Sequence, residues 1–354
     1  MWLRDNAPDR QTRSPENGQK LITVGEIPAN TTIVAATADG ATLTVSFQPE
    51  NRTIGYDLGW LRRNAYDHPA RDGRGWIASG IETWDSRSLA ATPEATMETL
   101  KADTAHLRDW LAAVVRLGFG KVVAGNTKPG ALFEVVDLFG YVRETNYGRH
   151  FEVRTEVNPT NLAFSSVGLQ PHTDNPYRDP VPTLQVLYCL ENSAEGGENI
   201  LVDGLRAAER LRADSPDHFE VLSAYCARFQ YAGDGSTNVC ARRPILELAP
   251  DGELTAIRFN NRSLAAVTDV PFERMDAWYA AYRRLGEIVD DPAMQVMVRL
   301  EPGACFLLDN TRVLHGRTAY AGSGRRWLQG CYADKDGLLS KLAVLTAVCR
   351  ESAE

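Results

Sequence analysis

The stretch Q-P-H-T-D-N at residues 170–175 places a histidine and an aspartate two positions apart. If His172 and Asp174 lie on a β-strand, both side chains point to one face, because successive side chains alternate. Such a pair by itself is more often surface or capping polarity than a metal site. A third ligand is available at His315, in the stretch N-T-R-V-L-H-G-R at residues 310–317. Two imidazoles and one carboxylate on one face of an ion are typical of non-haem iron(II) oxygenases, because coordination positions stay open for a cosubstrate and dioxygen.

An arginine follows the second histidine at a suitable interval. Arg326 lies eleven positions after His315 and heads the strand-like segment R-W-L-Q-G. A guanidinium suits the far carboxylate of a 2-oxo acid, because its planar fork donates two parallel hydrogen bonds to a carboxylate. Arg317 and Arg325 are alternatives for this role, but neither begins such a strand pattern. The four residues together predict an oxygenase that uses iron(II), dioxygen and a 2-oxo acid.

Composition excludes several other classes of protein. The 354 residues are 44% hydrophobic, which is enough for a substantial core, and the formal net charge is −8. Nucleic-acid binding needs clustered lysine and arginine, and the sequence has no such run. No apolar stretch approaches the roughly 20 residues that cross a bilayer, and the first residues lack the apolar segment of a secretory signal. We therefore expect a cytoplasmic protein whose partner is a small molecule, with neither nucleic acid nor membrane.

The pattern along the chain predicts two domains of unequal size. Short alternating segments broken by polar turns favour a small β-rich domain over residues 1–66, and the polar, Gly/Asp-rich residues 67–90 are expected to be a linker. Helical spacing of apolar residues predicts helices over 96–117 and 129–140. Residues 91–354 also carry strand patterns at both ends of a helical insert. This order predicts a mainly β catalytic domain with helices, the double-stranded β-helix or jelly-roll of cupin-like enzymes.

With these residues identified, the chain resembles the γ-butyrobetaine hydroxylase and trimethyllysine hydroxylase branch of the TauD-like iron(II)/2-oxoglutarate dioxygenases. The resemblance spans nearly the whole chain, and the ordered set of motifs is more specific than any one of them. In order along the chain, the motifs are Trp2–Asn6, Gly59–Leu61, His172–Asp174, Gly196–Gly197, Val202–Gly204, Asp309–Asn310 and Leu314–Arg317.

The resemblance implies a role for each of these site residues. Iron falls on His172, Asp174 and His315, and the 2-oxoglutarate carboxylate falls on Arg326. An aromatic cage for a trimethylammonium group is expected, because such a cation cannot donate a hydrogen bond and favours the faces of aromatic rings. The cage positions are Tyr147, Phe151, Phe164 and Tyr332, and the anionic end of the substrate meets Asn161 and Asn260. A homodimer is implied in the same way.

Departures from the family pattern bear on zinc and on the substrate. The family's N-terminal zinc ligands, three cysteines and a histidine, correspond to Ala7, Asp9, Thr12 and Arg52, so no zinc is expected. Asn175 stands where animal γ-butyrobetaine hydroxylases have a tyrosine, and Phe164 also replaces a tyrosine. Arg262 adds a positive charge at the anion end. These changes favour a more highly charged anion, and the leading hypothesis is 2-(trimethylamino)ethylphosphonate, hydroxylated next to its anionic group.

Alternatives remain at this point. The substrate could be γ-butyrobetaine, as in carnitine synthesis, or free trimethyllysine. The aromatic residues of the cage could be ordinary core residues, and Arg262 could pair with a surface carboxylate. A different class of function is a sensor module that binds metal and a betaine without turning it over; the intact triad and Arg326 speak against it.

Overall fold

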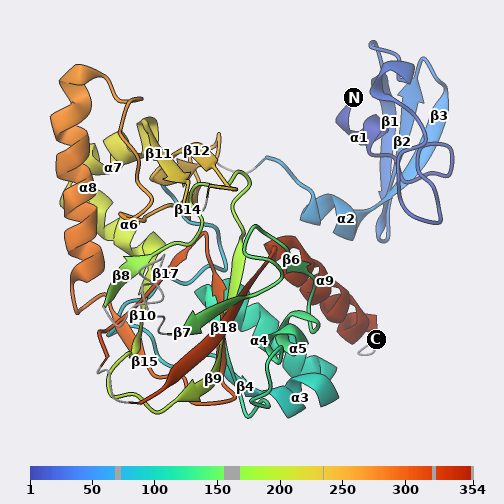
Figure 1. The fold of residues 1–354 in the computed structure, drawn as a ribbon. Helices are drawn as coiled ribbons and strands as arrows, with labels where there is room; N and C mark the ends of the chain where they lie inside the picture. The colour runs from blue at the N-terminus through green and yellow to red at the C-terminus, as the bar shows by residue number, and fades with distance from the viewer. Residues whose placement is uncertain (68–72, 155–167, 234, 321–323, 352–354) are drawn as a thin grey trace. The chain divides into compact units, whose positions relative to one another are not determined.

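The computed structural model describes residues 1–67, 73–154, 168–233, 235–320 and 324–351, with side chains up to residue 348. The chain forms two compact units, Met1–Asp72 and Gly73–Glu354 (Figure 1).

The first unit is a small antiparallel sheet with two short helices. Its strands pair in the order β1-β2-β3. Successive side chains of β2 and β3 point to opposite faces of the sheet. On one face a small core forms from Val45, Phe47, Ile54 and Tyr56, while every residue of β1 is exposed. The elements are α1 (Trp2–Asp5), β1 (Thr32–Asp39), β2 (Thr42–Gln48), β3 (Arg52–Asp57) and α2 (Leu58–Arg63).

In the second unit the described residues form two principal sheets. The larger has the order β4-β5-β16-β9-β18-β6, with β7 also on β18, and the smaller has the order β15-β10-β17-β8. Only the β4–β5 pairing is parallel among these. The larger sheet contains β4 (Glu94–Thr96), β5 (Phe119–Val123), β6 (Val142–Arg143), β7 (Phe151–Arg154), β9 (Leu184–Asn192), β16 (Cys305–Asp309) and β18 (Arg326–Ala333). The smaller contains β8 (Leu169–His172), β10 (Asn199–Asp203), β15 (Val296–Val298) and β17 (Val313–Arg317).

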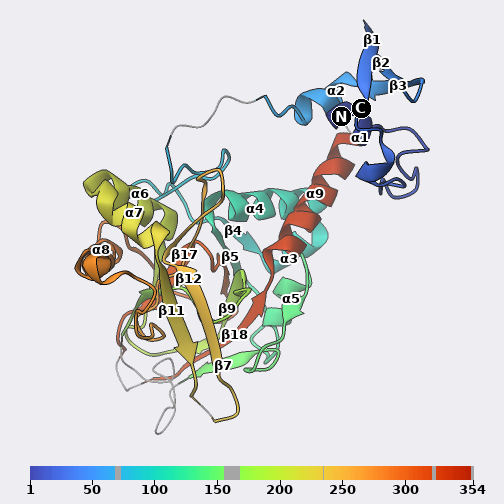
Figure 2. The same cartoon turned by 90° about the horizontal axis from the view of Figure 1, so that it is seen from above.

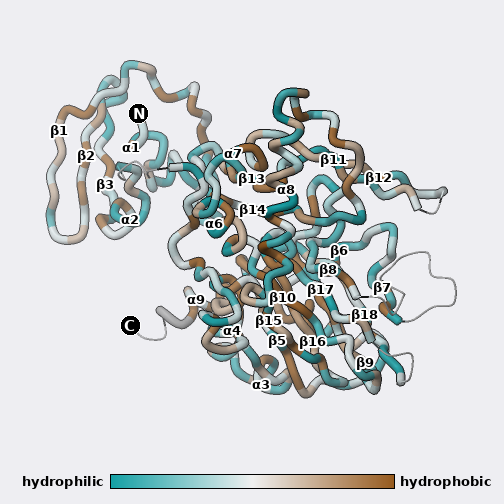
Figure 3. Tube along the Cα trace, turned by 90° about the vertical axis from the view of Figure 1, so that its left-hand side faces the viewer, coloured by the Kyte–Doolittle hydropathy of each residue, from teal (hydrophilic) through white to brown (hydrophobic). Residues whose placement is uncertain are grey.

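Apolar side chains of the two sheets pack against each other in one core, to which Phe306 and Leu328 contribute from the larger sheet and Leu201 and Val313 from the smaller. Figure 3 shows the apolar residues concentrated along these strands. Two facing antiparallel sheets of this kind make the expected jelly-roll.

Helices cover the jelly-roll in two groups (Figures 1 and 2). One group packs on the larger sheet: α3 (Met97–Ala102), α4 (Thr104–Leu117), α5 (Leu132–Val136) and α9 (Lys335–Glu351). The other consists of α6 (Gly204–Asp214), α7 (Pro216–Ala224) and α8 (Met275–Asp290). Two hairpins accompany this group, formed by β11 (Cys226–Tyr231) with β12 (Val239–Pro244) and by β13 (Leu246–Leu248) with β14 (Leu254–Ile257). No described helix is both long enough and apolar enough to span a membrane.

Residues 73–90, which the sequence analysis assigned to a linker, pack as part of the second unit. Trp84 is 1% exposed, and its backbone N–H donates to the Asp203 carboxylate at 3.0 Å. Its indole N–H donates to the Leu117 carbonyl at 2.7 Å. Polar and glycine-rich composition is common to linkers and to ordered turns, so composition alone did not reveal that one buried tryptophan anchors this stretch.

Two helices differ from their predicted bounds. The predicted helix 96–117 is two helices, because the Asp103 side chain accepts from the backbone N–H groups of Ala105 and His106 and starts α4 afresh. The predicted helix 129–140 is shorter, since only α5 is helical there.

Candidate active site

A cavity of about 620 Å³ opens beside the two sheets of the second unit. Residues of β8, β10 and β17 line it from the smaller sheet, and residues of β9 and β18 line it from the larger. The end of the β11–β12 hairpin and the loop 260–265 complete the lining. Segments far apart in the sequence therefore contribute side chains to one cavity.

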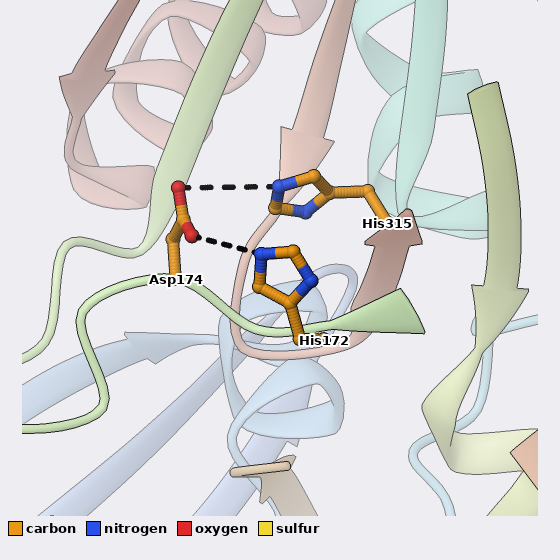
Figure 4. Close-up of side chains that lie close together, drawn as sticks. All are labelled: His172, Asp174 and His315. Carbon is orange, nitrogen blue, oxygen red and sulfur yellow. Dashed lines mark ion pairs between the residues drawn. The ribbon is translucent and has the colours of Figure 1, made fainter. Parts of the chain in front are cut away.

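The predicted metal ligands converge in this cavity. His172 is the last residue of β8 and is the cross-strand neighbour of His315 on β17. Asp174 lies beyond the end of β8, so the expectation that both residues of the pair lie on a strand holds for His172 only. The turn still brings Oδ1 of Asp174 to 3.3 Å from Nε2 of His172, and Oδ2 to 3.9 Å from Nε2 of His315 (Figure 4).

The donor set fits a divalent metal ion. Nδ1 of His172 lies 2.7 Å from the Gln170 carbonyl, and because a carbonyl only accepts, Nδ1 carries the proton and Nε2 keeps its lone pair. Burial lowers the pKa of His315 to about 3, so this imidazole is neutral near pH 7. The ligand atoms of the triad lie within 4.8 Å of one another. Two neutral imidazoles and one carboxylate are the set that iron(II) oxygenases use.

Neighbouring side chains hold the Asp174 carboxylate in place. Gln185 and the Tyr332 hydroxyl donate to its Oδ2 at 2.7 and 2.9 Å. The Asn310 side chain accepts from the Asp174 backbone N–H at 2.7 Å and donates to its carbonyl at 2.9 Å. Burial opposes the ionisation of Asp174, but its contacts with His172 and His315 and the nearby charge of Arg262 outweigh this cost and hold the pKa of Asp174 well below its usual range. The group is therefore an ionised, oriented ligand.

Two of the three arginines considered for the oxo acid face the cavity. Arg326 begins β18 and is 7% exposed, and its Nη2 donates to the Asn199 side-chain oxygen at 3.4 Å. Its Nε is buried and has no hydrogen-bond partner among the described residues. Arg317, which ends β17, lines the same cavity. Arg325 does not line it, and its side chain is 83% exposed.

Aromatic rings line the cavity next to the triad. The Phe151 ring centroid lies 5.2 Å from that of Tyr332 and 6.2 Å from that of Tyr147. Tyr177 and Tyr231 extend this aromatic wall: their rings stack at 5.3 Å, and Tyr231 lies 5.8 Å from Tyr147. The described part of the wall thus combines three predicted cage residues with two that were not predicted.

A chain of hydrogen bonds ties this wall to the loop that follows Asp174. The hydroxyls of Tyr147 and Tyr177 lie 2.8 Å apart, and Tyr177 donates to the Asn175 side-chain oxygen at 2.5 Å. Burial raises the pKa of Tyr147 to about 12, so its phenol stays protonated. Asn175 has a positive φ of 52° and is buried, and its Nδ2 has no partner among the described residues. Asn175 therefore presents a donor within the cavity lining.

Only some of the residues predicted to meet the anionic end of the substrate are among the described residues. Arg262 lines the cavity, and its Nη2 lies 2.6 Å from Nε2 of His172. Asn260 also lines it, but its amide donates to the Thr173 carbonyl and accepts from the backbone N–H groups of Arg262 and Ser263. Asn260 thus shapes the turn that carries Arg262. Asn161 and Phe164 lie outside the described residues.

Sequence reasoning missed Tyr177, Tyr231 and Gln185 at the site. Tyr177 lies only three residues after Asp174, so its closeness to the triad motif was a usable signal. Gln185 alternates inward on β9 beside Leu187, but an inward glutamine cannot be told from an outward one before the sheet is known. Nothing near Tyr231 in the sequence indicates that its hairpin turns toward the triad.

A jelly-roll that gathers two histidines and one aspartate beside a buried arginine defines a class: non-haem iron oxygenases that use a 2-oxo acid. The family model described as "Taurine catabolism dioxygenase TauD, TfdA family" matches residues 85–332, and the chain belongs to this family. The protein is a dioxygenase that uses iron(II), 2-oxoglutarate and dioxygen.

Curated relatives lie in the predicted branch. The gamma-butyrobetaine dioxygenase of Pseudomonas sp. (strain AK-1) is 33% identical over 347 residues, which cover 98% of this chain and 89% of that protein. The mitochondrial trimethyllysine dioxygenase of Gallus gallus is 28% identical over 351 residues, which cover 98% of this chain and 82% of that protein. The resemblance to this branch is therefore confirmed.

Solved structures share the fold at low identity. A crystal structure of asparagine oxygenase superposes with a TM-score of 0.53 at 19% identity, covering 67% of this chain and 81% of that one. A putative alpha-ketoglutarate-dependent taurine dioxygenase from Burkholderia xenovorans gives 0.52 at 14% identity, covering 71% and 92%. These likenesses confirm the jelly-roll fold.

Proposed function

We propose that the enzyme hydroxylates a small zwitterion bearing a trimethylammonium group, and that this substrate is 2-(trimethylamino)ethylphosphonate, hydroxylated next to the phosphonate. The observation that carries the proposal is the arrangement of two recognition groups around the metal triad. Tyr332 of the aromatic wall contacts Asp174, and Arg262 contacts His172. A molecule stretched between the aromatic wall and Arg262 therefore passes the triad.

The cation pole of the proposed site is the aromatic wall. Tyr147, Phe151 and Tyr332 present rings whose neighbouring centroids lie 5.2 to 6.2 Å apart. Ring faces attract a quaternary ammonium by about 0.5–2 kcal/mol each, and more when the cation is desolvated. Phe164, the fourth residue predicted for the cage, lies outside the described residues.

The anion pole of the proposed site is Arg262. A metal ion on His172 needs the same Nε2 lone pair to which Arg262 Nη2 now points at 2.6 Å. Metal binding would take this lone pair away from Nη2, and we propose that Nη2 then donates to the substrate anion. A phosphonate has more acceptor oxygens than a carboxylate and a higher charge, so it gains more from a guanidinium. The carbon next to the anion would lie nearest the triad.

We further propose that His172, Asp174 and His315 hold the iron and that Arg326 binds the far carboxylate of 2-oxoglutarate. Iron(II) bound there would let one dioxygen oxidise 2-oxoglutarate to succinate and carbon dioxide and place its second oxygen atom in one substrate C–H bond as a hydroxyl group. The protein's own contribution is position: Gln185 and Tyr332 fix the carboxylate ligand, and the two poles fix which carbon faces the metal.

A second candidate substrate is γ-butyrobetaine, with free trimethyllysine as a third. The 33% identity to a bacterial gamma-butyrobetaine dioxygenase over nearly the whole chain supports it. The candidates share the cation pole and differ at the anion pole, where a carboxylate makes fewer hydrogen bonds than a phosphonate.

The deciding experiment is a substrate panel. The protein is loaded anaerobically with iron(II) and 2-oxoglutarate, then given each trimethylammonium acid under oxygen while succinate and hydroxylated product are measured. We expect the phosphonate to give the highest kcat/KM. Arg262→Gln should lower kcat/KM for the phosphonate about 10- to 100-fold, and should lower kcat/KM for γ-butyrobetaine by a smaller factor.

Arg283→Gln is the matched control, since Arg283 is exposed on α8 and outside this cavity. A wild-type preference for γ-butyrobetaine, or equal losses for both acids in Arg262→Gln, would replace the phosphonate proposal. Absence of succinate with every member would remove the trimethylammonium proposal.

A further inference from the structure

We propose that Arg317 is a second guanidinium of the 2-oxo acid subsite and shares the far carboxylate of the cosubstrate with Arg326. This inference rests on the proposed role of Arg326 and adds a residue to it. It concerns cosubstrate recognition only, so it does not depend on which trimethylammonium acid is hydroxylated.

Strand geometry places Arg317 beside the metal triad. His315 and Arg317 lie two residues apart on β17, so both side chains point to the same face, with their Cα atoms about 7 Å apart. Both residues line the cavity. A short diacid bound through its oxo acid end at the triad therefore extends along β17 toward Arg317.

Arg326 reaches the same place from the other sheet. It begins β18, and its side chain donates to Asn199, which is the cross-strand neighbour of Arg317 in the pairing of β10 with β17. The guanidinium carbons of Arg317 and Arg326 lie 5.3 and 5.7 Å from the ring centroid of Tyr320. Two guanidiniums from two sheets thus gather around one aromatic ring.

Both guanidiniums are buried in this arrangement. Arg317 is 4% exposed and Arg326 is 7% exposed. Arginine side chains keep their positive charge in proteins, so two like charges are buried close together here. Two like charges out of water repel each other, and a carboxylate between them relieves the repulsion.

The backbone at Gly197 lies close to the Arg326 side chain, next to a donor that such an anion could use. Gly197 has a positive φ of 71°, and a Cβ there would lie 3.3 Å from Nε of Arg326. That Nε has no hydrogen-bond partner among the described residues although it is buried. A carboxylate has about four lone-pair sites, which is enough to accept from two guanidiniums at once.

The test measures cosubstrate binding without turnover. Wild-type protein and the Arg317→Gln, Arg317→Lys and Arg325→Gln variants are loaded with iron(II) anaerobically and titrated with 2-oxoglutarate, following the visible absorption of the bound oxo acid. A parallel titration uses 2-oxovalerate, which has the same chain length and lacks the far carboxylate. We expect Arg317→Gln to weaken 2-oxoglutarate about 10- to 100-fold and to leave 2-oxovalerate unchanged.

Two further variants make the result decisive. Arg317→Lys keeps the charge and loses the planar fork, so its affinity should be intermediate; it decides the question if Arg317→Gln does not fold. Arg325→Gln, an exposed neighbour of Arg326, should bind as wild type does. Equal affinity of wild type and Arg317→Gln for 2-oxoglutarate, or equal losses for both oxo acids, would overturn the inference. Failure of the wild-type protein to bind 2-oxoglutarate would instead remove the role proposed for Arg326.

Discussion

At the scale of single residues, Tyr332 has two functions that one substitution would confuse. Its ring belongs to the aromatic wall, and its hydroxyl donates to Oδ2 of Asp174 at 2.9 Å. Burial holds its pKa well above the usual value, so the phenol remains a donor at neutral pH. Tyr332→Ala removes ring and donor together, and its effect on substrate binding could not be separated from its effect on the metal.

Tyr332→Phe should separate the two functions. The ring stays, so KM for the trimethylammonium substrate should change little, while iron(II) affinity should fall about tenfold because the ligand loses one orienting hydrogen bond. Anaerobic iron titration and substrate kinetics at saturating iron measure the two effects. Tyr147→Phe is the control, since that hydroxyl faces Tyr177 rather than Asp174. Unchanged iron affinity in Tyr332→Phe would show that Gln185 alone is sufficient to orient the carboxylate.

The residues that could be predicted from sequence are those whose chemistry is specific at short range. His172 and Asp174 formed a recognisable pair, His315 completed it, and Arg326 headed a strand. Tyr231 could not be predicted as part of the site, because its ring reaches the cavity through a hairpin whose direction depends on tertiary packing. Arg317 was a candidate from sequence, but its closeness to Arg326 follows only from the pairing of β10 with β17, which places it opposite Asn199.

At the scale of elements, the β11–β12 hairpin connects the two proposed poles. The Gln230 N–H donates to the Ser263 carbonyl at 2.9 Å and the Ala265 N–H to the Arg228 carbonyl at 2.8 Å, so the segment after Arg262 pairs with β11. The last residue of β11 is Tyr231, which belongs to the aromatic wall. The relative position of Arg262 and Tyr231 is therefore set by one hydrogen-bonded element.

Asp269 fixes this element from outside the cavity. Its carboxylate accepts from Arg228 on β11 at 2.6 and 3.1 Å and from Arg242 on β12 at 2.6 Å. Asp269→Asn should raise KM for the trimethylammonium substrate about fivefold, equivalent to ~1 kcal/mol of lost positioning, because both poles shift together. KM for 2-oxoglutarate should not change, since that subsite lies on β17 and β18.

Kinetics with each substrate varied in turn test this prediction, with Asp214→Asn as the control. Asp214 pairs with Arg284 at 2.7 Å on the helical layer, away from the hairpin. If Asp269→Asn only destabilised the protein, KM for both substrates would rise, or the amount of active enzyme would fall as much in Asp269→Asn as in Asp214→Asn. That outcome would make Asp269 a stability residue with no part in recognition.

Element boundaries show where sequence patterns stop being sufficient. Apolar spacing gave the inner face of 96–117 correctly, since Leu107, Leu111 and Val114 are buried in α4. It did not show the break at Asp103, because an aspartate inside a helical pattern and one that caps a new helix read alike.

At the scale of the whole molecule, the first unit shows what surrounds the four positions that the resemblance matched to zinc ligands. Asp9 pairs with Arg52, and its carboxylate accepts from the Thr12 hydroxyl at 2.8 Å. Thr12 in turn accepts from Arg4, which is 2% exposed and donates twice to Glu50 at 2.8 Å. Charged side chains thus tie the loop at residues 9–12 to the end of β2 and the start of β3.

The stability of this unit should therefore be independent of metal and dependent on the Arg4–Glu50 pair. Treatment of the protein with a chelator should leave amide hydrogen exchange over residues 1–67 unchanged. The side chains of this network bind one another and need no metal ion. Glu50→Gln should increase exchange there by lowering local stability by about 3 kcal/mol, since it leaves a buried guanidinium without its counter-charge. Exchange over the second unit should be unaffected in this variant, which makes it the internal control. Faster exchange after chelation alone would mean that a metal still stabilises the first unit, and that charged side chains have not replaced it.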